Sequence, residues 1–378
     1  MRIALIGPTH PYRGGVSQHT TLLCRHLRRF HEVDFISFRR QYPQWLFPGR
    51  TDRDPSRFPD IETCVRILDA ADPSTWEPAA RRAAGFRPDA LVLVWWVPFF
   101  APAWWFIIRR VRARIRVPVI FVCHNVLPHE TNAVLERIAR TALGAADGFV
   151  VHSEADRGRL LGLRPDAAVI RCPIAPHPSL SPYRGSRRQA RVELGIGGRS
   201  PVFLFFGFVR PYKGLDLLLD AMTVVAARRP GAVLLVVGEF WEPVEKTRAG
   251  IRQLKLEDAV RIIDRYVGNE EVGVYFAACD AVVLPYRSAT QSGVPQMAAA
   301  LGRQAVVTDV GGLAENVKRT GLGRVVPPGD PAALARAMLS LAAGPEPARP
   351  KGPDPAWADI VHAIETLGRP FPAGKNAG

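Results

Sequence analysis

The sequence predicts an α/β protein with two Rossmann-like domains, each built on a parallel sheet with helices on both faces. Its 378 residues, 47% of them hydrophobic, supply enough apolar surface for two separate cores. Short apolar runs alternate with helical stretches along nearly the whole chain, which is the pattern of wound parallel sheets. A stretch with four prolines and no periodicity at 173–185 divides the chain into two such halves and is typical of a linker.

The elements of each half follow from this alternation. In the first half we expect strands at 2–7, 33–38, 90–95, 118–123, 148–152 and 168–171, with helices such as 15–29 and 132–146. In the second half we expect strands at 202–206, 232–237, 260–263, 281–284, 304–308 and 324–326, with helices at 214–228, 244–254, 270–278 and 293–301. The expected domains are 1–175 and 176–345, followed by a C-terminal helix and tail at 346–378. Ligands of such sheets bind at the carboxyl ends of the strands, so we expect the site in a cleft between the domains.

The charge balance predicts an anionic partner. Fifty Lys and Arg against 35 Asp and Glu leave a formal charge of +15, and Arg109–Arg116 holds five arginines in eight residues. Every basic residue of the first half is Arg, so a plain compositional preference for Arg explains part of the excess equally well. No recognised nucleic-acid module or base-stacking platform is visible, and nucleic acid is not expected as a partner.

Ala90–Ile108 is uncharged over 19 residues and is followed at once by the arginine run, which fits a crude transmembrane template. Pro98 and Pro102 interrupt it, and its first residues resemble a buried parallel strand. We therefore predict a strand, an aromatic loop and a basic helix. Two interpretations of the tryptophans beside arginines stay open: packing in the core, or peripheral contact with an anionic membrane.

The five cysteines, Cys24, Cys64, Cys123, Cys172 and Cys279, show neither CxxC pairing nor metal-ligand spacing. They indicate a reducing compartment. The apolar run after Met1 is too short for a secretion signal and is predicted to be a strand. We expect a cytoplasmic protein, which acts at the inner face of the cell membrane if the anionic partner is a membrane.

The strongest chemical motif follows the strand 202–206. The strand ends at Gly207, a short loop presents Arg210 and Lys213, and a helix begins near Gly214. Backbone amides and the dipole of a helix N-terminus favour negative charge, and two cations beside them add to the attraction. This arrangement predicts a diphosphate site, although two solvated loop cations are the alternative.

Two further turns offer backbone amides to a ligand. Before the helix at 293–301, the hydroxyls and amides of Thr290, Gln291, Ser292 and Gly293 can reach the same phosphates. In the first turn of the chain, Gly14 and Gly15 let a ligand approach the backbone closely, although a flexible turn explains them equally well. The first turn is not GxGxxG, so a dinucleotide site is not supported.

A polar segment follows the strand 118–123. His124, His129 and Glu130 can exchange hydrogen bonds with sugar hydroxyls or assist proton transfer. A metal site built from the same three residues lacks a further obvious ligand. No metal and no other cofactor is expected.

These segments resemble the family 4 glycosyltransferases, which are retaining enzymes with the GT-B fold of two facing Rossmann-like domains and an interdomain cleft. The resemblance covers essentially the whole chain and rests on Gly14-Gly15, His124–Glu130, Gly207–Gly214 and Gly311–Glu315. It implies that His124, Arg210 and Lys213 are catalytic: the cations grip the donor diphosphate, and His124 lies beside the reacting sugar. The donor-binding residues it implies are Gly15, Gly207, Arg210, Lys213, Thr290, Gln291, Ser292 and Gly293. The acceptor-binding residues, expected in the N-terminal domain, are His10, Gly14, His129 and Glu130.

Two departures from the family pattern affect the donor site. Phe208 stands where an arginine commonly follows the strand-ending glycine, so Arg210 must supply that charge. The usual pair of glutamates, which holds the donor's sugar and ribose hydroxyls, falls on Ala289 and Met297. Gln291, Ser292 and Gln296 are the nearby polar substitutes, and donor specificity stays open.

The resemblance implies transfer of a sugar from a nucleoside diphosphate sugar to a hydroxyl acceptor, with retention at the anomeric carbon. A lipid-linked or cell-surface glycan precursor is the acceptor class that a basic, aromatic first domain suits. Two alternatives remain. One is a nucleotide-sugar epimerase of the same fold, which needs carboxylates in the site. The other is a non-catalytic nucleotide-sugar-binding subunit, which fits the loss of the glutamate pair.

Overall fold

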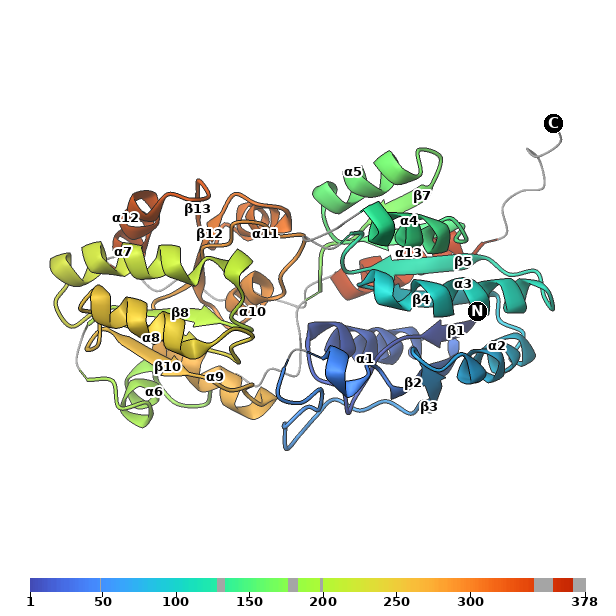
Figure 1. Cartoon of the computed structure of the whole chain (residues 1–378), viewed down its shortest axis with the longest axis horizontal. Helices are drawn as coiled ribbons and strands as arrows, with labels where there is room; N and C mark the ends of the chain where they lie inside the picture. Colours follow the sequence, from blue (N-terminus) through green and yellow to red (C-terminus); the bar gives the residue numbers. More distant parts are fainter. Residues whose placement is uncertain (48, 128–132, 176–182, 198–199, 343–355, 370–378) are drawn as a thin grey trace. The chain divides into compact units, whose positions relative to one another are not determined.

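The computed structural model describes residues 1–47, 49–127, 133–175, 183–197, 200–342 and 356–369 (Figure 1). The chain divides into two compact units, and neither is continuous in sequence. Unit 1 consists of Met1–Phe47, Asp60–Pro173 and Pro355–Gly378; unit 2 consists of Pro48–Pro59 and Ile174–Asp354. The expected boundary at 175 lies between the strands of the first sheet and those of the second, and the expected boundary at 345 lies after the last strand. Two short segments nevertheless belong to the unit on the other side of those boundaries, which local patterns cannot reveal.

Unit 1 is built on a seven-stranded parallel sheet in the order β3-β2-β1-β4-β5-β6-β7. Its strands are β1 Arg2–Ile6, β2 Glu32–Arg40, β3 Val65–Asp69, β4 Ala90–Trp95, β5 Val119–Cys123, β6 Gly148–Val151 and β7 Ala168–Arg171. All except β3 were predicted from apolar runs. β3 is a short edge strand interrupted by the exposed Arg66, so its apolar signal is weak.

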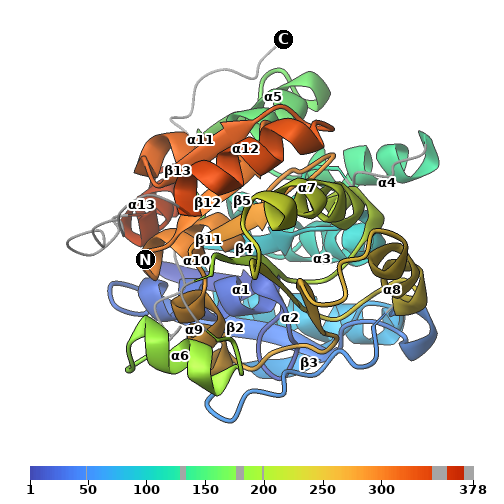
Figure 2. The ribbon, with the colours of Figure 1, turned by 90° about the vertical axis from the view of Figure 1, so that its left-hand side faces the viewer.

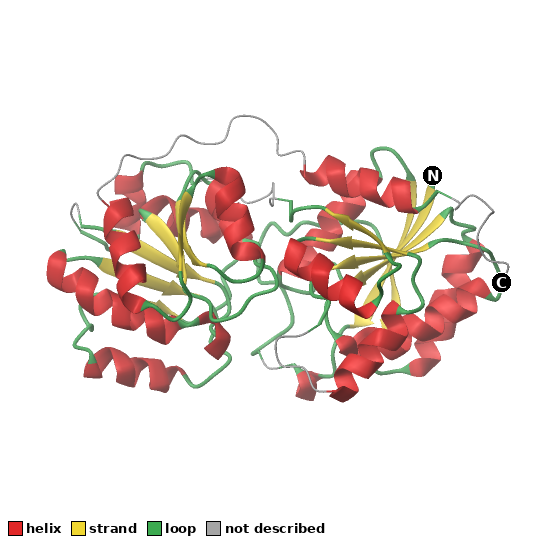
Figure 3. Cartoon of the chain, turned by 90° about the horizontal axis from the view of Figure 1, so that it is seen from above, coloured by secondary structure: helices red, strands yellow, loops and turns green. Residues whose placement is uncertain are grey.

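Helices cover both faces of this sheet (Figure 3). They are α1 Gly15–Leu27, α2 Trp76–Gly85, α3 Ala101–Arg112, α4 Ala133–Leu143, α5 Glu154–Leu163 and α13 Ala356–Leu367. Three short 3₁₀ turns, η1 Gln44–Leu46, η2 Pro73–Thr75 and η3 Pro98–Phe100, join them. The predicted last helix is α13, and it packs against α1 and β6 of unit 1 (Figure 1).

The uncharged segment 90–108 is β4, η3 and most of α3, as predicted. Among the described residues no helix has both the length and the apolar character that crossing a bilayer requires. Trp95, Phe100 and Trp104 are completely buried, so core packing accounts for most of the aromatic residues. Trp105 is exposed, and the Arg109 guanidinium lies 4.8 Å from its ring.

The arginine run that follows is largely engaged in ion pairs. Arg110 and Arg114 bind the Glu77 carboxylate at 2.8 and 2.6 Å, and Arg112 binds Asp147 at 2.5 Å. Solvent screens these pairs, so they add little to the stability of the fold. They nevertheless neutralise part of the charge that the sequence places there.

Unit 2 is built on a six-stranded parallel sheet in the order β10-β9-β8-β11-β12-β13. Its strands are β8 Val202–Phe206, β9 Val233–Val237, β10 Val260–Ile263, β11 Ala281–Leu284, β12 Gln304–Thr308 and β13 Gly323–Val326. Its helices are α6 Arg187–Glu193, η4 Pro211–Lys213, α7 Leu215–Arg228, α8 Val244–Gln253, α9 Asn269–Ala278, α10 Val294–Ala300, α11 Gly312–Thr320 and α12 Pro331–Ala342.

Successive side chains of this sheet enter two separate cores. Leu204 and Val282 belong to the core on one face, whereas Phe203 and Val283 belong to the core on the other. Helices α7 and α12 lie side by side over the second face (Figure 2). Burial on both faces explains why these strands are continuous apolar runs.

In each sheet, successive strands are added first toward one edge and then, from one point on, toward the other edge. In unit 1 the reversal lies between β1 and β4, and in unit 2 between β8 and β11. Loops leaving the carboxyl ends of two such strands diverge to opposite faces and open a crevice in which ligands of wound sheets bind. The loops after β1, β8 and β11 contain ligand-binding residues that the sequence predicts, and the loop after β5 contains the others.

Candidate functional site

The loop after β8 brings two cations to the N-terminus of α7. Gly207 leaves the strand with φ of +106°, and Gly214 enters the helix in the left-handed conformation. The Lys213 side chain folds back along the loop toward Gly207. The Nζ atom of Lys213 lies only 3.2 Å from the position that a Cβ added at Gly207 would take. The sequence places these residues together in one loop, and the fold aims the lysine at the strand end.

Lys213 is a buried cation. Only 8% of the residue is exposed, and its ammonium lies 5.4 Å from the centre of the Tyr286 ring. Burial, together with the neighbouring Arg210 charge, lowers the pKa of Lys213 from 10.5 to about 7. The Arg210 guanidinium lies over the rings of Tyr212 and Trp241, at 5.5 and 5.1 Å. An anion bound here would offset the repulsion between the two cations.

The loop after β11 is tied to the first loop. A Cβ at Gly214 would lie 2.2 Å from the Pro285 carbonyl oxygen, so the two backbones meet there. Arg287 donates to both carboxylate oxygens of Asp216 at 2.7 and 2.6 Å, and its backbone N–H donates to the Tyr212 carbonyl at 2.8 Å. Arg287 is thus engaged in holding the loops together.

Thr290, Gln291, Ser292 and Gly293 lie between this contact and α10. Thr290 is buried, Gln291 and Ser292 are half-buried, and Gly293 is exposed as the N-cap residue of α10. The Thr290 carbonyl accepts a hydrogen bond from the N–H of Gly312 at 3.0 Å. The predicted donor residues of this loop therefore lie beside the glycine pair that starts α11.

The positions of the missing glutamates are apolar. Ala289 is buried in one core of unit 2, and Met297 packs against that core. Buried amides lie on the same elements and on α11. Within the described residues, the Nε2 atom of Gln291, the Oε1 atom of Gln296 and both polar atoms of Asn316 are buried without a hydrogen-bond partner. Buried amides normally find partners, so these groups are suited to sugar or ribose hydroxyls. Asn316 was not identified from the sequence, because its position within a helix carries no local signal.

In unit 1 the loop after β1 leaves a glycine-lined surface at the start of α1. Gly14 is the N-cap residue with φ of +104°, and a Cβ at Gly14 or Gly15 would meet no atom within 4 Å. The His10 carbonyl accepts a hydrogen bond from the Arg66 guanidinium at 2.8 Å, and the His10 side chain is half-buried. The open space beside Gly14 and Gly15 is what close approach of a ligand requires.

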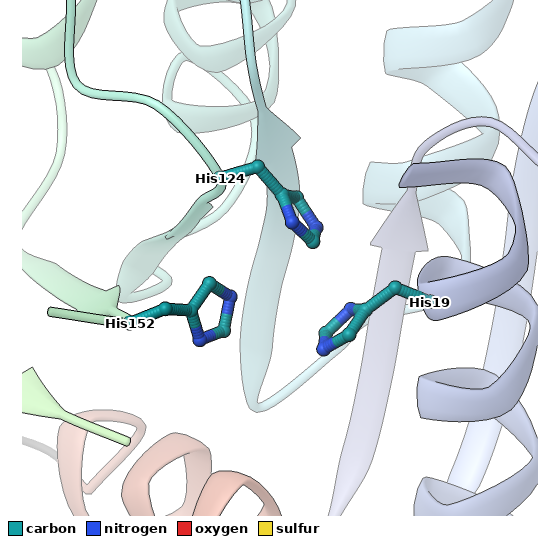
Figure 4. A group of neighbouring side chains, drawn as sticks. All are labelled: His19, His124 and His152. Atoms are coloured by element: carbon teal, nitrogen blue, oxygen red, sulfur yellow. The ribbon is translucent and has the colours of Figure 1, made fainter. Parts of the chain in front are cut away.

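His124 follows β5 and lies in a group of three buried histidines. The others are His19 of α1 and His152, which directly follows β6 (Figure 4). The ring centres of His19 and His124 are 4.6 Å apart, and that of His152 lies 5.2 and 5.1 Å from them. Residues 128–132, with the predicted acceptor residues His129 and Glu130, lie outside the described residues.

His124 and His152 are neutral near pH 7. Burial lowers the pKa of His124 well below 6.5, and the adjacent His152 lowers it further. Burial likewise lowers the pKa of His152 to about 4, although a hydrogen bond to the Cys172 carbonyl opposes the shift. Neither His19 nor His152 was identified from the sequence. The position of His152 after a parallel strand is a signal that could have identified it.

Two protein-family models match this chain. A model described as "Glycosyltransferase Family 4" matches residues 13–177, and one described as "Glycosyl transferases group 1" matches residues 200–343. Together they span most of the chain and include the loops after β5, β8 and β11.

Curated relatives carry the name D-inositol 3-phosphate glycosyltransferase. The protein from Saccharomonospora viridis is 31% identical over 210 residues, which are 53% of this chain and 48% of that protein. The protein from Segniliparus rotundus is 34% identical over 195 residues, 50% of this chain and 42% of that protein. The chain thus spans about half the length of the curated relatives it matches.

Solved structures show the same fold over nearly the whole chain. Sucrose-phosphate synthase from Thermosynechococcus elongatus superposes with a TM-score of 0.68 at 20% identity, over 97% of this chain and 94% of that one. HepE of Anabaena, solved with UDP, superposes with a TM-score of 0.70 at 16% identity over the same shares of the two chains. The predicted GT-B fold is confirmed.

Proposed function

The chain belongs to family 4 of the glycosyltransferases, and we propose that it transfers a sugar from a nucleoside diphosphate sugar to a hydroxyl acceptor. We further propose that the anomeric configuration is retained. The observation that carries the proposal is the buried Lys213 beside Arg210 at the N-terminus of α7. A buried ammonium whose pKa is lowered to about 7 gains stability from a bound diphosphate.

The reaction mainly requires stabilisation of the leaving diphosphate. Lys213, Arg210 and the backbone N–H groups at the start of α7 and α10 supply fixed positive charge where negative charge develops on the leaving oxygen. No metal is needed for that step. The departing phosphate can take the acceptor's proton, so the protein need not provide a strong base.

We assign His124 a hydrogen-bonding role beside the reacting sugar. Because burial keeps its imidazole neutral, it can exchange hydrogen bonds with a hydroxyl without adding charge. Gly15 contributes its open backbone at the donor, whereas His10 and Gly14 are assigned to the acceptor with His129 and Glu130. The buried amides of Gln291, Gln296 and Asn316 are proposed to replace the glutamate pair.

A thermal-shift screen against UDP, GDP and ADP sugars tests the donor site. We expect one nucleotide class to stabilise the wild-type protein and to lose its effect in Lys213→Ala. With that donor and an acceptor, Lys213→Ala should reduce turnover by on the order of 10²- to 10³-fold. The matched control is Lys246→Ala, which removes an exposed lysine of α8. Near-normal turnover in Lys213→Ala would refute the assignment of this site.

A non-catalytic nucleotide-sugar-binding subunit is the second candidate, because Ala289 and Met297 replace the glutamates. It predicts nucleotide binding in calorimetry without transfer to any acceptor in a broad panel. The epimerase alternative predicts a changed sugar configuration, with no free nucleotide, when donor is supplied without acceptor. Release of nucleotide only when acceptor is present excludes both.

For the acceptor we propose an anionic or lipid-linked molecule presented at the inner face of the cell membrane. The net charge of +15, the exposed Trp105 next to Arg109, and relatives named for inositol 3-phosphate all favour a negatively charged acceptor. The five cysteines are unpaired with one another, which fits a reducing compartment. Flotation with vesicles that contain anionic lipid should occur at low salt and weaken as salt rises. Failure to float at any salt concentration would remove the membrane from the proposal.

A further inference from the structure

We propose that His19, His124 and His152 form a binding site for one divalent transition-metal ion of the Zn²⁺ type. The three side chains come from α1, from the end of β5 and from the end of β6, and their rings turn toward a common point (Figure 4). One ring nitrogen of each lies within 4.8 Å of those of the other two. All three histidines are buried, with at most 8% of each residue exposed.

The hydrogen bond made by His152 defines which nitrogen can bind a metal. Its Nδ1 atom lies 2.8 Å from the Cys172 carbonyl oxygen, which can only accept, so Nδ1 carries the proton. With the proton on Nδ1, Nε2 carries the lone pair of the ring, and among the described residues it has no hydrogen-bond partner. Metal-binding histidines typically donate their second N–H to a backbone carbonyl, which fixes the tautomer in this way.

His124 presents a second lone pair to the same space. Its Nε2 atom is buried, and no described residue forms a hydrogen bond with it. A histidine that served packing alone would be expected to satisfy both nitrogens when buried, since an unpaired polar atom destabilises the fold. Two neighbouring imidazoles with unpaired Nε2 atoms are accounted for by a shared ligand.

The spacing is close to what a metal requires. Zn²⁺ binds imidazole nitrogens at about 2.0–2.1 Å, so two nitrogens on one tetrahedral ion lie about 3.4 Å apart. The ring nitrogens lie up to 4.8 Å apart, so metal binding requires small rotations of the rings that shorten these distances. The three α-carbons need not move far, because each imidazole turns about its own side-chain bonds.

The surroundings favour a transition metal over Mg²⁺ or Ca²⁺. Three imidazoles suit Zn²⁺, Cu²⁺ or Ni²⁺, whereas the alkaline-earth ions prefer oxygen ligands. The Trp357 ring, 4.9 Å from that of His19, shields one side. The completely buried Asp156 carboxylate accepts a hydrogen bond at 2.8 Å from the hydroxyl of Ser153, the residue next to His152, so a negative charge lies nearby to balance a cation. Three protein ligands leave a fourth position for water or another ligand.

Metal binding to tag-free, full-length protein tests the site. After dialysis against Zn²⁺ and removal of free ion, we expect about one zinc per chain by mass spectrometry, and Co²⁺ should give the visible absorption of a four-coordinate site. His152→Asn places an amide N–H where it can keep the bond to Cys172 but removes Nε2. This variant and His19→Ala should weaken binding by on the order of 10- to 100-fold or more. His362→Ala, which removes an exposed histidine, is the matched control and should bind like wild type.

X-ray absorption of the zinc-loaded wild-type protein keeps the test decisive if a variant fails to fold. We expect imidazole nitrogens at about 2.0–2.1 Å from the ion. The proposal is overturned if wild type shows no saturable binding, if its spectrum lacks imidazole ligands, or if folded His152→Asn and His19→Ala both retain wild-type affinity.

Occupancy of the site has one consequence that rests on the proposed function. An ion holding the His124 imidazole would withdraw it from the sugar, so the ion would inhibit transfer instead of assisting it. Because the binding experiments contain no substrate, they succeed or fail independently of the transferase activity.

Discussion

At the scale of single residues, Lys213 couples stability to ligand binding. Its pKa is lowered from 10.5 to about 7, first by burial and then by Arg210. Below pH 7 the ammonium is charged in both the folded and the unfolded chain, and the folded state bears the full cost of burying it. Between pH 7 and 10.5 only the unfolded state stays protonated, so folding stability rises with pH in that window.

Replacement of this lysine by an apolar residue should therefore stabilise the protein without ligand. We expect Lys213→Met to raise the free energy of unfolding by on the order of 2 kcal/mol at pH 6, and by less at pH 9. Urea unfolding of wild type and variant at both pH values measures the difference. Lys246→Met should show no such pH dependence. A Lys213→Met protein that is less stable than wild type at pH 6 would contradict the assigned burial cost.

Gly214 holds the two loops of unit 2 in contact. Its φ of +67° is unfavourable for other residues, and a Cβ would lie 2.2 Å from the Pro285 carbonyl oxygen. We expect Gly214→Ala to destabilise unit 2 by on the order of 2–4 kcal/mol. Hydrogen exchange of peptides from β8 and β11 should accelerate, while peptides of unit 1 stay unchanged. Gly293→Ala is the control, since its φ is −76° and its Cβ would meet nothing; equal effects of the two variants would refute the argument.

At the scale of elements, α13 completes unit 1 from the far end of the sequence. Trp357 stacks on His26 with ring centres 4.8 Å apart, and Glu365 binds His31 at 3.0 Å. Leu367 lies over β6, where a Cβ on Gly148 would approach its Cδ2 to 2.9 Å. Helix α13 therefore covers the sheet at Gly148, where β6 has no side chain to fill the space.

Removal of the indole from α13 should weaken this packing. We expect Trp357→Ala to lower the stability of unit 1 by on the order of 3–5 kcal/mol, because Trp357 is 6% exposed and fills the space between α13 and α1. Faster hydrogen exchange in peptides from α1 and β6 is the measurement. Trp45→Ala, which truncates a tryptophan that is 84% exposed, should change stability by only about 0.5 kcal/mol. Similar exchange in the two variants would show that α13 contributes little.

At the scale of the whole molecule, the chain crosses between its two units more often than a single linker requires. Residues 49–59 come from the first half but join unit 2. There the Arg50 N–H donates to Glu239 at 2.8 Å, the Arg50 guanidinium binds Asp264 at 2.5 Å, and Ser56 accepts from the N–H of Asn269 at 3.0 Å. Each unit therefore depends on a segment that is distant in sequence.

This discontinuity predicts how fragments behave. A fragment of residues 1–173 lacks α13, so we expect it to keep helical structure but to unfold without a sharp transition. Joining residues 355–378 to it through a Gly/Ser linker should restore cooperative unfolding and a near-ultraviolet circular dichroism signal. Equal cooperativity with and without the added helix would show that unit 1 folds without α13.

Much of the fold is visible in the sequence because it is encoded locally. Strands such as β4 and β8 are continuous apolar runs, since both faces of each sheet are covered, and the loop from Gly207 to Gly214 carries its glycines and cations within eight residues. β3 was missed because a short edge strand with Arg66 exposed has little apolar signal. The assignments of His129 and Glu130 stay predictions, since these residues lie outside the described part of the chain.

The sequence by itself determined the two wound sheets, the strand-end loops and the resemblance to family 4, because periodicity and turn chemistry depend on neighbouring residues. Only the tertiary structure decided that Lys213 is buried, that His19 and His152 join His124, and that α13 closes unit 1. These features depend on contacts between segments far apart in the chain. Burial and the resulting pKa shifts follow from packing in space, which no local pattern of residues contains.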